Sequence, residues 1–189
     1  MDDLLLGFRD WLPSLNVNFT GNNNLQYIDQ SGSRLSAFPR MIYGLTKPKY
    51  LNLQNTALGE NIISFTVFED MPHLKLLLLG NTKLSYSISS DDNFTLFKAL
   101  VELEILDLAS CSVTRLPHLE MFTLTSLTLL NLLLNFIEHL DIALRNVSYL
   151  KVLNLSLNQI TKFSDTMRLQ FDLPAVVSHR PGRLVVDLS

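Results

Sequence analysis

The sequence has little of what several classes of protein require. Its single cysteine, Cys111, excludes an internal disulfide. The longest apolar stretches are broken by polar residues, so no run of about 18 apolar residues can span a bilayer. Charged residues make up only 17% of the chain and the net charge is −3, which indicates neither a polyanion nor a membrane surface as partner. Met1-Asp2-Asp3 is acidic where a secretory signal peptide is basic.

Catalytic and metal-binding patterns are also missing. There is no glycine-rich phosphate loop, and none of the four histidines has an acidic or nucleophilic partner at the spacing of a triad or a metal site (His73, His118, His139 and His179). We therefore predict that the chain is not an enzyme. We also expect no cofactor and no metal.

Apolar residues, by contrast, make up 47% of the chain and follow a recurring pattern of eleven residues. The pattern is Leu, two residues, Leu, one residue, Leu, two residues, a small polar residue, one residue, and an aliphatic residue. It begins at Leu74, Leu103, Leu127 and Leu150, and a degraded copy begins at Pro48. This is the leucine-rich repeat.

The repeat predicts both the strands and their stacking. Its fourth and sixth residues are two apart, as Leu106 and Leu108 are, which places both on the inner face of a strand with Asp107 facing outward. Such short strands bury their inner face only when they are stacked. The predicted fold is an α/β solenoid, a segment of a leucine-rich repeat horseshoe, with a parallel β-sheet on the concave face and irregular or short helical segments on the convex face.

The ninth position of each repeat carries a small side chain that we expect to hydrogen-bond buried backbone groups where the chain turns away from the sheet. We call these residues the turn ladder, and we interpret the cysteine among them as a buried structural thiol. Its members are Thr56, Thr82, Cys111, Asn135 and Asn158.

We predict one domain over residues 1–189, with a degraded repeat at about 14–47, repeats starting at 48, 74, 103, 127 and 150, and a truncated repeat from about 183. The degraded repeat admits two frames. One has a strand near Val17 and Phe19; the other has inward positions at Leu25, Ile28 and Gln30, with Ser33 on the turn ladder. We favour the first, because burying an amide is costly. Neither end carries a capping unit, so we expect a piece of a longer protein.

The exposed strand positions of such a solenoid form one extended surface, which predicts binding rather than catalysis. The alternative for its apolar members is a row that packs along the sheet, formed by the third strand positions Leu76, Ile105, Leu129 and Val152. We interpret the basic C-terminal segment as solvated and assign no nucleic acid partner. The candidate contact residues are Lys75, Leu76, Leu78, Asp107, Asn131, Leu133, Leu134, Phe136 and Lys151.

Four Asn-x-Ser/Thr acceptor sequences slightly favour an extracellular setting. Asn18, Asn93 and Asn146 are the candidate glycosylation sites. Asn154 points from the concave face, where a glycan would block binding, and we expect it to be unused.

The closest resemblance is to the ectodomain of Toll-like receptors. Three features carry it: the uneven repeat lengths, the sequence segments 150–160 and 183–189, and the phenylalanine framework, as in Phe68-Glu69-Asp70-Met71-Pro72-His73-Leu74. The resemblance implies a pattern-recognition receptor on the plasma membrane or endosome, facing outward or into the lumen. It would bind a protein or microbial ligand on its concave or lateral face and pair with a second receptor chain. The alternatives are another extracellular adhesion or matrix protein and an intracellular scaffold.

Overall fold

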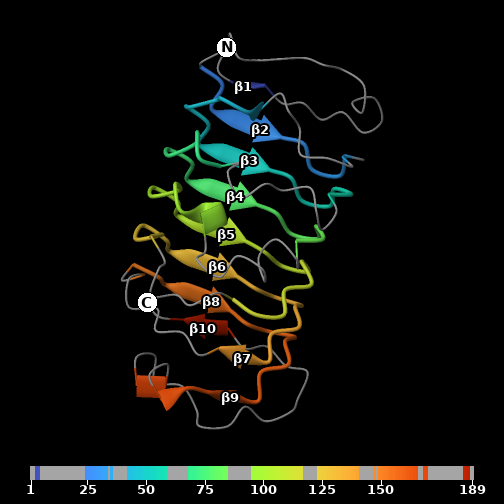
Figure 1. The fold of residues 1–189 in the computed structure, drawn as a ribbon, viewed down its shortest axis with the longest axis vertical. Coiled ribbons are helices and arrows are strands. Elements are labelled where there is room, and N and C mark those ends of the chain that lie inside the picture. Colours follow the sequence, from blue (N-terminus) through green and yellow to red (C-terminus); the bar gives the residue numbers. More distant parts are fainter. Residues whose placement is uncertain are drawn as a thin grey trace.

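The computed structural model describes residues 3–4, 24–33, 35, 42–58, 68–84, 95–116, 123–140, 147, 149–165, 168–169 and 185–187. Within these residues the main element is an eight-stranded sheet in the order β1-β2-β3-β4-β5-β6-β8-β10. Figure 1 shows the strands stacked along the long axis of the molecule. Their bounds are β1 Asp3–Leu4, β2 Tyr27–Asp29, β3 Tyr50–Asn52, β4 Leu76–Leu78, β5 Ile105–Asp107, β6 Leu129–Asn131, β8 Val152–Asn154 and β10 Val185–Asp187.

The register of the sheet follows the repeat. Leu51, Leu77 and Leu106 lie opposite one another on neighbouring parallel strands, and Leu130 and Leu153 continue the row. The sixth-position leucines form a second buried row behind it (Leu53, Leu79, Leu108, Leu132 and Leu155). The predicted fold is confirmed: the chain is a leucine-rich repeat solenoid whose leucines share one interior.

The favoured frame of the degraded repeat is wrong for residues 25–35. β2 pairs in parallel with β3 and places Ile28 opposite Leu51, so Gln30 holds an inward position and is only 2% exposed. The backbone N–H of Gln30 donates to Asn52 O at 2.9 Å, and Ser33 Oγ donates to Gln30 O at 2.6 Å. Burial of the repeat's aliphatic residues therefore outweighs the cost of one buried amide. Val17 and Phe19 lie outside the described residues.

The C-terminal strand also differs from the expectation of a further parallel repeat. A strand is present, but β10 runs antiparallel to β8, with Val186 opposite Leu153. A strand has a period of two residues in either direction, so the central residue of a short segment can face the same neighbour whichever way the chain runs.

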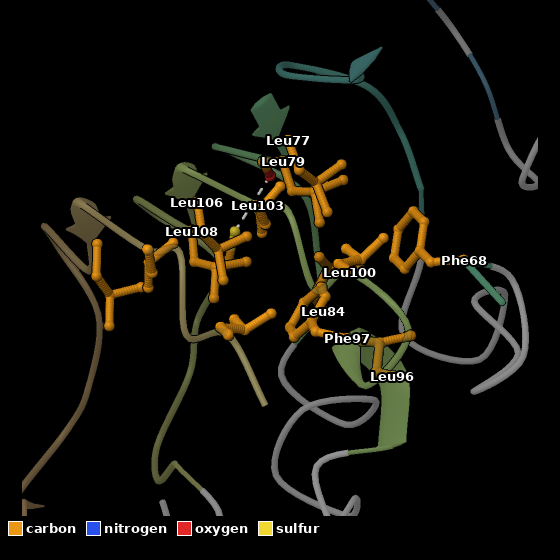
Figure 2. Close-up of a cluster of buried hydrophobic side chains, with 14 of the residues drawn as sticks. Phe68, Leu77, Leu79, Leu84, Leu96, Phe97, Leu100, Leu103, Leu106 and Leu108 are labelled. Atoms are coloured by element: carbon orange, nitrogen blue, oxygen red, sulfur yellow. Dashed lines mark hydrogen bonds between the residues drawn. The ribbon is translucent and has the colours of Figure 1, made fainter. Parts of the chain in front are cut away.

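The convex side fills the rest of the core. A 3-10 turn, η2 Thr95–Phe97, brings Phe97 against Phe68, with ring centroids 5.9 Å apart, and both rings are fully buried. Figure 2 shows the two rings facing the same interior as Leu79 and Leu108.

A second, two-stranded parallel sheet, β7 His139–Leu140 and β9 Lys162–Phe163, lies further along the last repeats. Within the described ranges, no helix combines the length and apolar character that crossing a bilayer requires.

Candidate partner-binding surface

The turn ladder fixes the backbone on which the surface is built. Asn135 Nδ2 donates to Leu108 O and Leu132 O, both at 2.9 Å, while its Oδ1 accepts from Cys111 N at 3.1 Å and Val113 N at 2.9 Å. Asn135 therefore joins two neighbouring repeats.

Asn158 has the same role one repeat later, with Nδ2 donating to Leu132 O at 2.8 Å and Leu155 O at 3.0 Å. The threonine side chains are shorter, and each donates within its own turn: Thr56 Oγ1 donates to Leu53 O at 2.8 Å and Thr82 Oγ1 to Leu79 O at 2.5 Å.

Cys111 is the remaining member of the ladder. Its Sγ is fully buried and lies 3.2 Å from Leu79 O and 3.6 Å from Thr82 Oγ1. Burial raises the pKa of the Cys111 thiol, which keeps it protonated at neutral pH. No group of three or more His, Cys, Asp or Glu side chains in the described part of the chain is arranged to hold a metal ion.

The residue just before each ladder position adopts a left-handed backbone, a feature that the sequence analysis missed. Gly adopts this conformation without strain and Asn tolerates it, whereas leucine disfavours it. The sequence did contain a signal, because three of the six positions hold Gly or Asn. The six residues are Gly32 (φ 69°), Asn55 (55°), Asn81 (57°), Ser110 (58°), Leu134 (57°) and Leu157 (56°).

Leu134, Phe136 and Leu157 form what we call the apolar rim, at the end of strands β6 and β8. Their exposed fractions are 49%, 51% and 44%. The repeats that carry the two leucines are joined here, since Leu134 N donates to Ser156 O at 3.0 Å. The rim therefore presents three large apolar side chains to solvent on adjoining repeats.

The third strand positions form a half-buried apolar and aromatic row along the concave face. Tyr27 and Tyr50 stack at its N-terminal end, with ring centroids 3.8 Å apart and planes 6° from parallel. Burial and the hydrogen bond with Tyr27 raise the pKa of Tyr50 to about 12. The row continues through Leu76, Ile105, Leu129 and Val152.

The fifth strand positions form a polar row beside it. In five of the six repeats from β2 to β8 an Asp or Asn accepts a hydrogen bond from the backbone N–H two residues later, which sets the turn that leaves the strand. Leu78 is the exception. The bonds are Ser31 N to Asp29 (2.9 Å), Gln54 N to Asn52 (3.1 Å), Ala109 N to Asp107 (2.9 Å), Leu133 N to Asn131 (3.2 Å) and Ser156 N to Asn154 (3.1 Å).

Asp107 has two further donors. Gln54 Nε2 reaches across β4 to Asp107 Oδ2 at 2.7 Å, and Asn131 Nδ2 donates to Oδ1 at 3.0 Å. Gly80 leaves room for this reach, because a Cβ there would lie 3.1 Å from Gln54 Nε2 and 3.5 Å from Asp107 Oδ2.

The structure places the predicted contact residues on the concave face or at its edge. Lys75 is exposed and pairs with Glu104, Nζ to Oε1 at 2.7 Å, and the contact raises the pKa of Lys75. Lys151 is exposed, and Asn131 and Leu133 are half-buried. The glycosylation candidates Asn18, Asn93 and Asn146 lie outside the described residues.

Three residues of this surface were not among the predicted contact residues: Tyr27, Tyr50 and Gln54. Tyr27 was missed because the favoured frame moved the first strand away from residues 27–29, whereas Tyr50 and Gln54 belong to the degraded repeat at Pro48, from which no contact residue was named. The 23-residue step from Leu25 to Pro48, which equals the step from Leu127 to Leu150, was the available signal.

The solenoid and its ordered turns define the fold class, a leucine-rich repeat solenoid. Among solved structures, the chain is similar to a leucine-rich repeat protein of Leptospira interrogans (TM-score 0.64, 22% identity, covering 86% of this chain and 38% of that one). It is similar to the ectodomain of the Arabidopsis thaliana receptor kinase GASSHO1/SCHENGEN3, solved in complex with CASPARIAN STRIP INTEGRITY FACTOR 2 (TM-score 0.61, 23% identity, covering 79% of this chain and 17% of that one). It is also similar to an internalin of Listeria monocytogenes (TM-score 0.57, 20% identity, covering 80% of this chain and 46% of that one).

These likenesses, at identities of 20–23%, establish the fold. The chain spans less than half of the length of each of the three proteins. No protein-family model matches it, and no curated protein does.

Proposed function

We propose that this chain is a partner-binding leucine-rich repeat domain that contacts another protein through its concave face and the apolar rim. The apolar rim carries the proposal. A left-handed backbone costs an L-residue roughly 1–2 kcal/mol, and exposing large apolar side chains to water gains nothing in the free chain. Leu134 and Leu157 combine both disadvantages, while other repeats place Gly, Asn or Ser there. A partner that covers the rim would supply the missing stabilisation.

The concave face supports the same use. Its half-buried apolar row and its hydrogen-bonded polar row lie side by side on short, regularly paired strands, which hold the side chains in a fixed arrangement before binding. One structurally similar protein, the Arabidopsis ectodomain, was solved in complex with another factor. We infer that the present surface is used for protein binding as well.

A finer proposal concerns the kind of receptor. The phenylalanine framework and the phrases at 150–160 and 183–189 support a Toll-like receptor ectodomain, on the extracellular side of the plasma membrane or in the endosome. Glycans found on Asn93 or Asn146 by peptide mapping would support the extracellular setting and contradict an intracellular scaffold. A coding sequence downstream of Ser189 for a membrane span and a Toll/interleukin-1 receptor domain would separate this receptor from an adhesion or matrix protein.

Photocrosslinking tests the binding proposal directly. Phe136→p-benzoylphenylalanine places a reactive ketone on the apolar rim, and Lys98→p-benzoylphenylalanine places one at an exposed position beside η2 as the control. In cells that express the chain, position 136 should give one saturable protein adduct that position 98 does not. Leu134→Asn together with Leu157→Asn should reduce that adduct. The proposal fails if position 136 gives no adduct, or gives the same adducts as position 98.

A further inference from the structure

The carboxylate of Asp107 is fixed in one orientation in the middle of the concave face. Its three donors, the amides of Gln54 and Asn131 and the backbone N–H of Ala109, lie at 2.7–3.0 Å and are all neutral. Asp107 is half-buried and lies on β5. In the sheet, β3 and β4 lie on one side of β5, and β6 and β8 lie on the other.

No cation of the chain compensates this carboxylate among the described residues. The ion pairs there join His73 to Glu102, Lys75 to Glu104 and Arg168 to Asp165. The lysines that directly precede β3, β4 and β8 stand at the second position of their repeats, whereas Asp107 stands at the fifth; they are Lys49, Lys75 and Lys151. A fixed negative charge of this kind complements a positive charge on a partner.

The hydrogen bonds already made decide which cation fits. A carboxylate offers about four acceptor sites, and Asp107 has used two on Oδ1 and one on Oδ2. A guanidinium could not form its two parallel bonds with the remaining site. An ammonium group is a compact donor that needs only one site, and its other N–H groups remain for water or for the side-chain carbonyl of Gln54.

The neighbours of Asp107 suit a lysine side chain. Leu78 lies directly opposite Asp107 on β4 and is half-buried, so it can cover the aliphatic stem of a lysine. Gly80 and Ala109 are the smallest residues of the seventh-position row and place no long side chain beside the carboxylate. We infer that the protein partner delivers a lysine ammonium to Asp107, with its stem over Leu78. This inference rests on the proposed function.

The test uses the Phe136→p-benzoylphenylalanine chain, whose adduct reports partner binding. Asp107→Asn removes the charge but keeps the size and the turn bond, and Asp70→Asn makes the same change at an exposed carboxylate in the turn at residues 68–70, away from the strands. We expect Asp107→Asn to lower the adduct yield at limiting partner about tenfold, with Asp70→Asn close to unchanged. Circular dichroism and a thermal melt should show that both variants are folded.

A second measurement needs no substitution at Asp107. Treating the partner-bound chain with a carbodiimide should join Asp107 to a partner lysine by an amide bond, which mass spectrometry of the digested adduct would locate. The inference is overturned if the Phe136 adduct is insensitive to Asp107→Asn, or if the coupled partner lysines all map to other carboxylates. In either case, the formation of the adduct at position 136 still supports the proposed function. If no adduct forms at position 136, the proposed function fails and the inference fails with it.

Discussion

At the scale of single residues, Leu134 holds a backbone conformation that leucine disfavours, while half of its side chain is in water. Leu134→Asn should therefore raise the free energy of unfolding by about 0.5–1 kcal/mol, because asparagine tolerates a positive φ and little burial is lost. Urea denaturation measures the change. Leu133→Asn, one residue earlier and half-buried, should give no gain. A loss of stability in Leu134→Asn would show that the leucine contributes packing in the free chain.

Leu134→Asn should at the same time weaken partner binding. A substitution that relieves strain in a binding surface is expected to stabilise the free chain and to weaken binding. An adduct at position 136 that kept its full yield in this variant would remove Leu134 from the contact surface.

Cys111 is expected to make the free energy of unfolding depend on pH in the alkaline range. Burial raises the pKa of its thiol above its ordinary value, so the folded chain keeps a proton that the unfolded chain releases. Stability is then independent of this group below the unfolded pKa and falls as the pH rises past it, by at most about 1.4 kcal/mol per pH unit.

Unfolding measured from pH 8 to pH 10 should show this fall in the unmodified chain and a smaller one in Cys111→Thr, which places there the residue used by two other repeats. Equal slopes in both proteins would assign the fall to other groups, Tyr50 among them.

At the scale of elements, the turn ladder differs in strength from repeat to repeat. Asn135 makes bonds to two repeats, whereas Thr82 holds only its own turn through its hydroxyl donor. Asn135→Ala leaves several buried backbone groups without a partner and should cost about 3 kcal/mol or more, while Thr82→Ala should cost about 1 kcal/mol.

Chemical denaturation of both variants measures the difference. Thr123→Ala, which removes an exposed bond to Lys98 O, is the matched control and should be close to neutral. Similar losses in Asn135→Ala and Thr82→Ala would contradict the role of asparagine in joining repeats.

The strands could be predicted from the sequence because two constraints agree in each strong repeat. Leu77 and Leu79 have strand spacing, and Thr82 stands where the turn must be satisfied. Around Gln30 these constraints conflict: the repeat length favours the observed frame, but the polar side chain argues against it. The direction of β10 could not be predicted either, because Val186 can face Leu153 in a parallel or an antiparallel pair.

The surface was less accessible to sequence reasoning than the core. Which positions face outward follows from the repeat, so Asp107 and Leu134 could be named. The reach of Gln54 to Asp107 could not be foreseen, because it joins residues from strands that are not neighbours and depends on the absence of a side chain at Gly80. The left-handed turns were overlooked because only three of the six residues reveal them.

At the scale of the whole molecule, the backbone pairing of the main sheet couples each strand to its immediate neighbours. β5 bonds to β4 and β6, and β2 bonds to β1 and β3. In such a stack, stability is close to the sum of the repeats and the interfaces between them, so the position of a defect decides how far its effect reaches.

This coupling predicts different consequences for the same kind of core substitution at two places. Leu106→Ala on β5 and Ile28→Ala on β2 each remove a buried aliphatic side chain and should each cost about 2–5 kcal/mol locally. Native-state hydrogen exchange should show that Leu106→Ala lowers amide protection in β4 and β6 on both sides. Ile28→Ala should lower it in β2 and β3 and leave β8 protected, because several intact interfaces separate them. If Ile28→Ala lowered the protection of β8 as much as that of β3, the described repeats would be a single cooperative unit, and a partner bound at the apolar rim would also stabilise the tyrosine pair on β2 and β3.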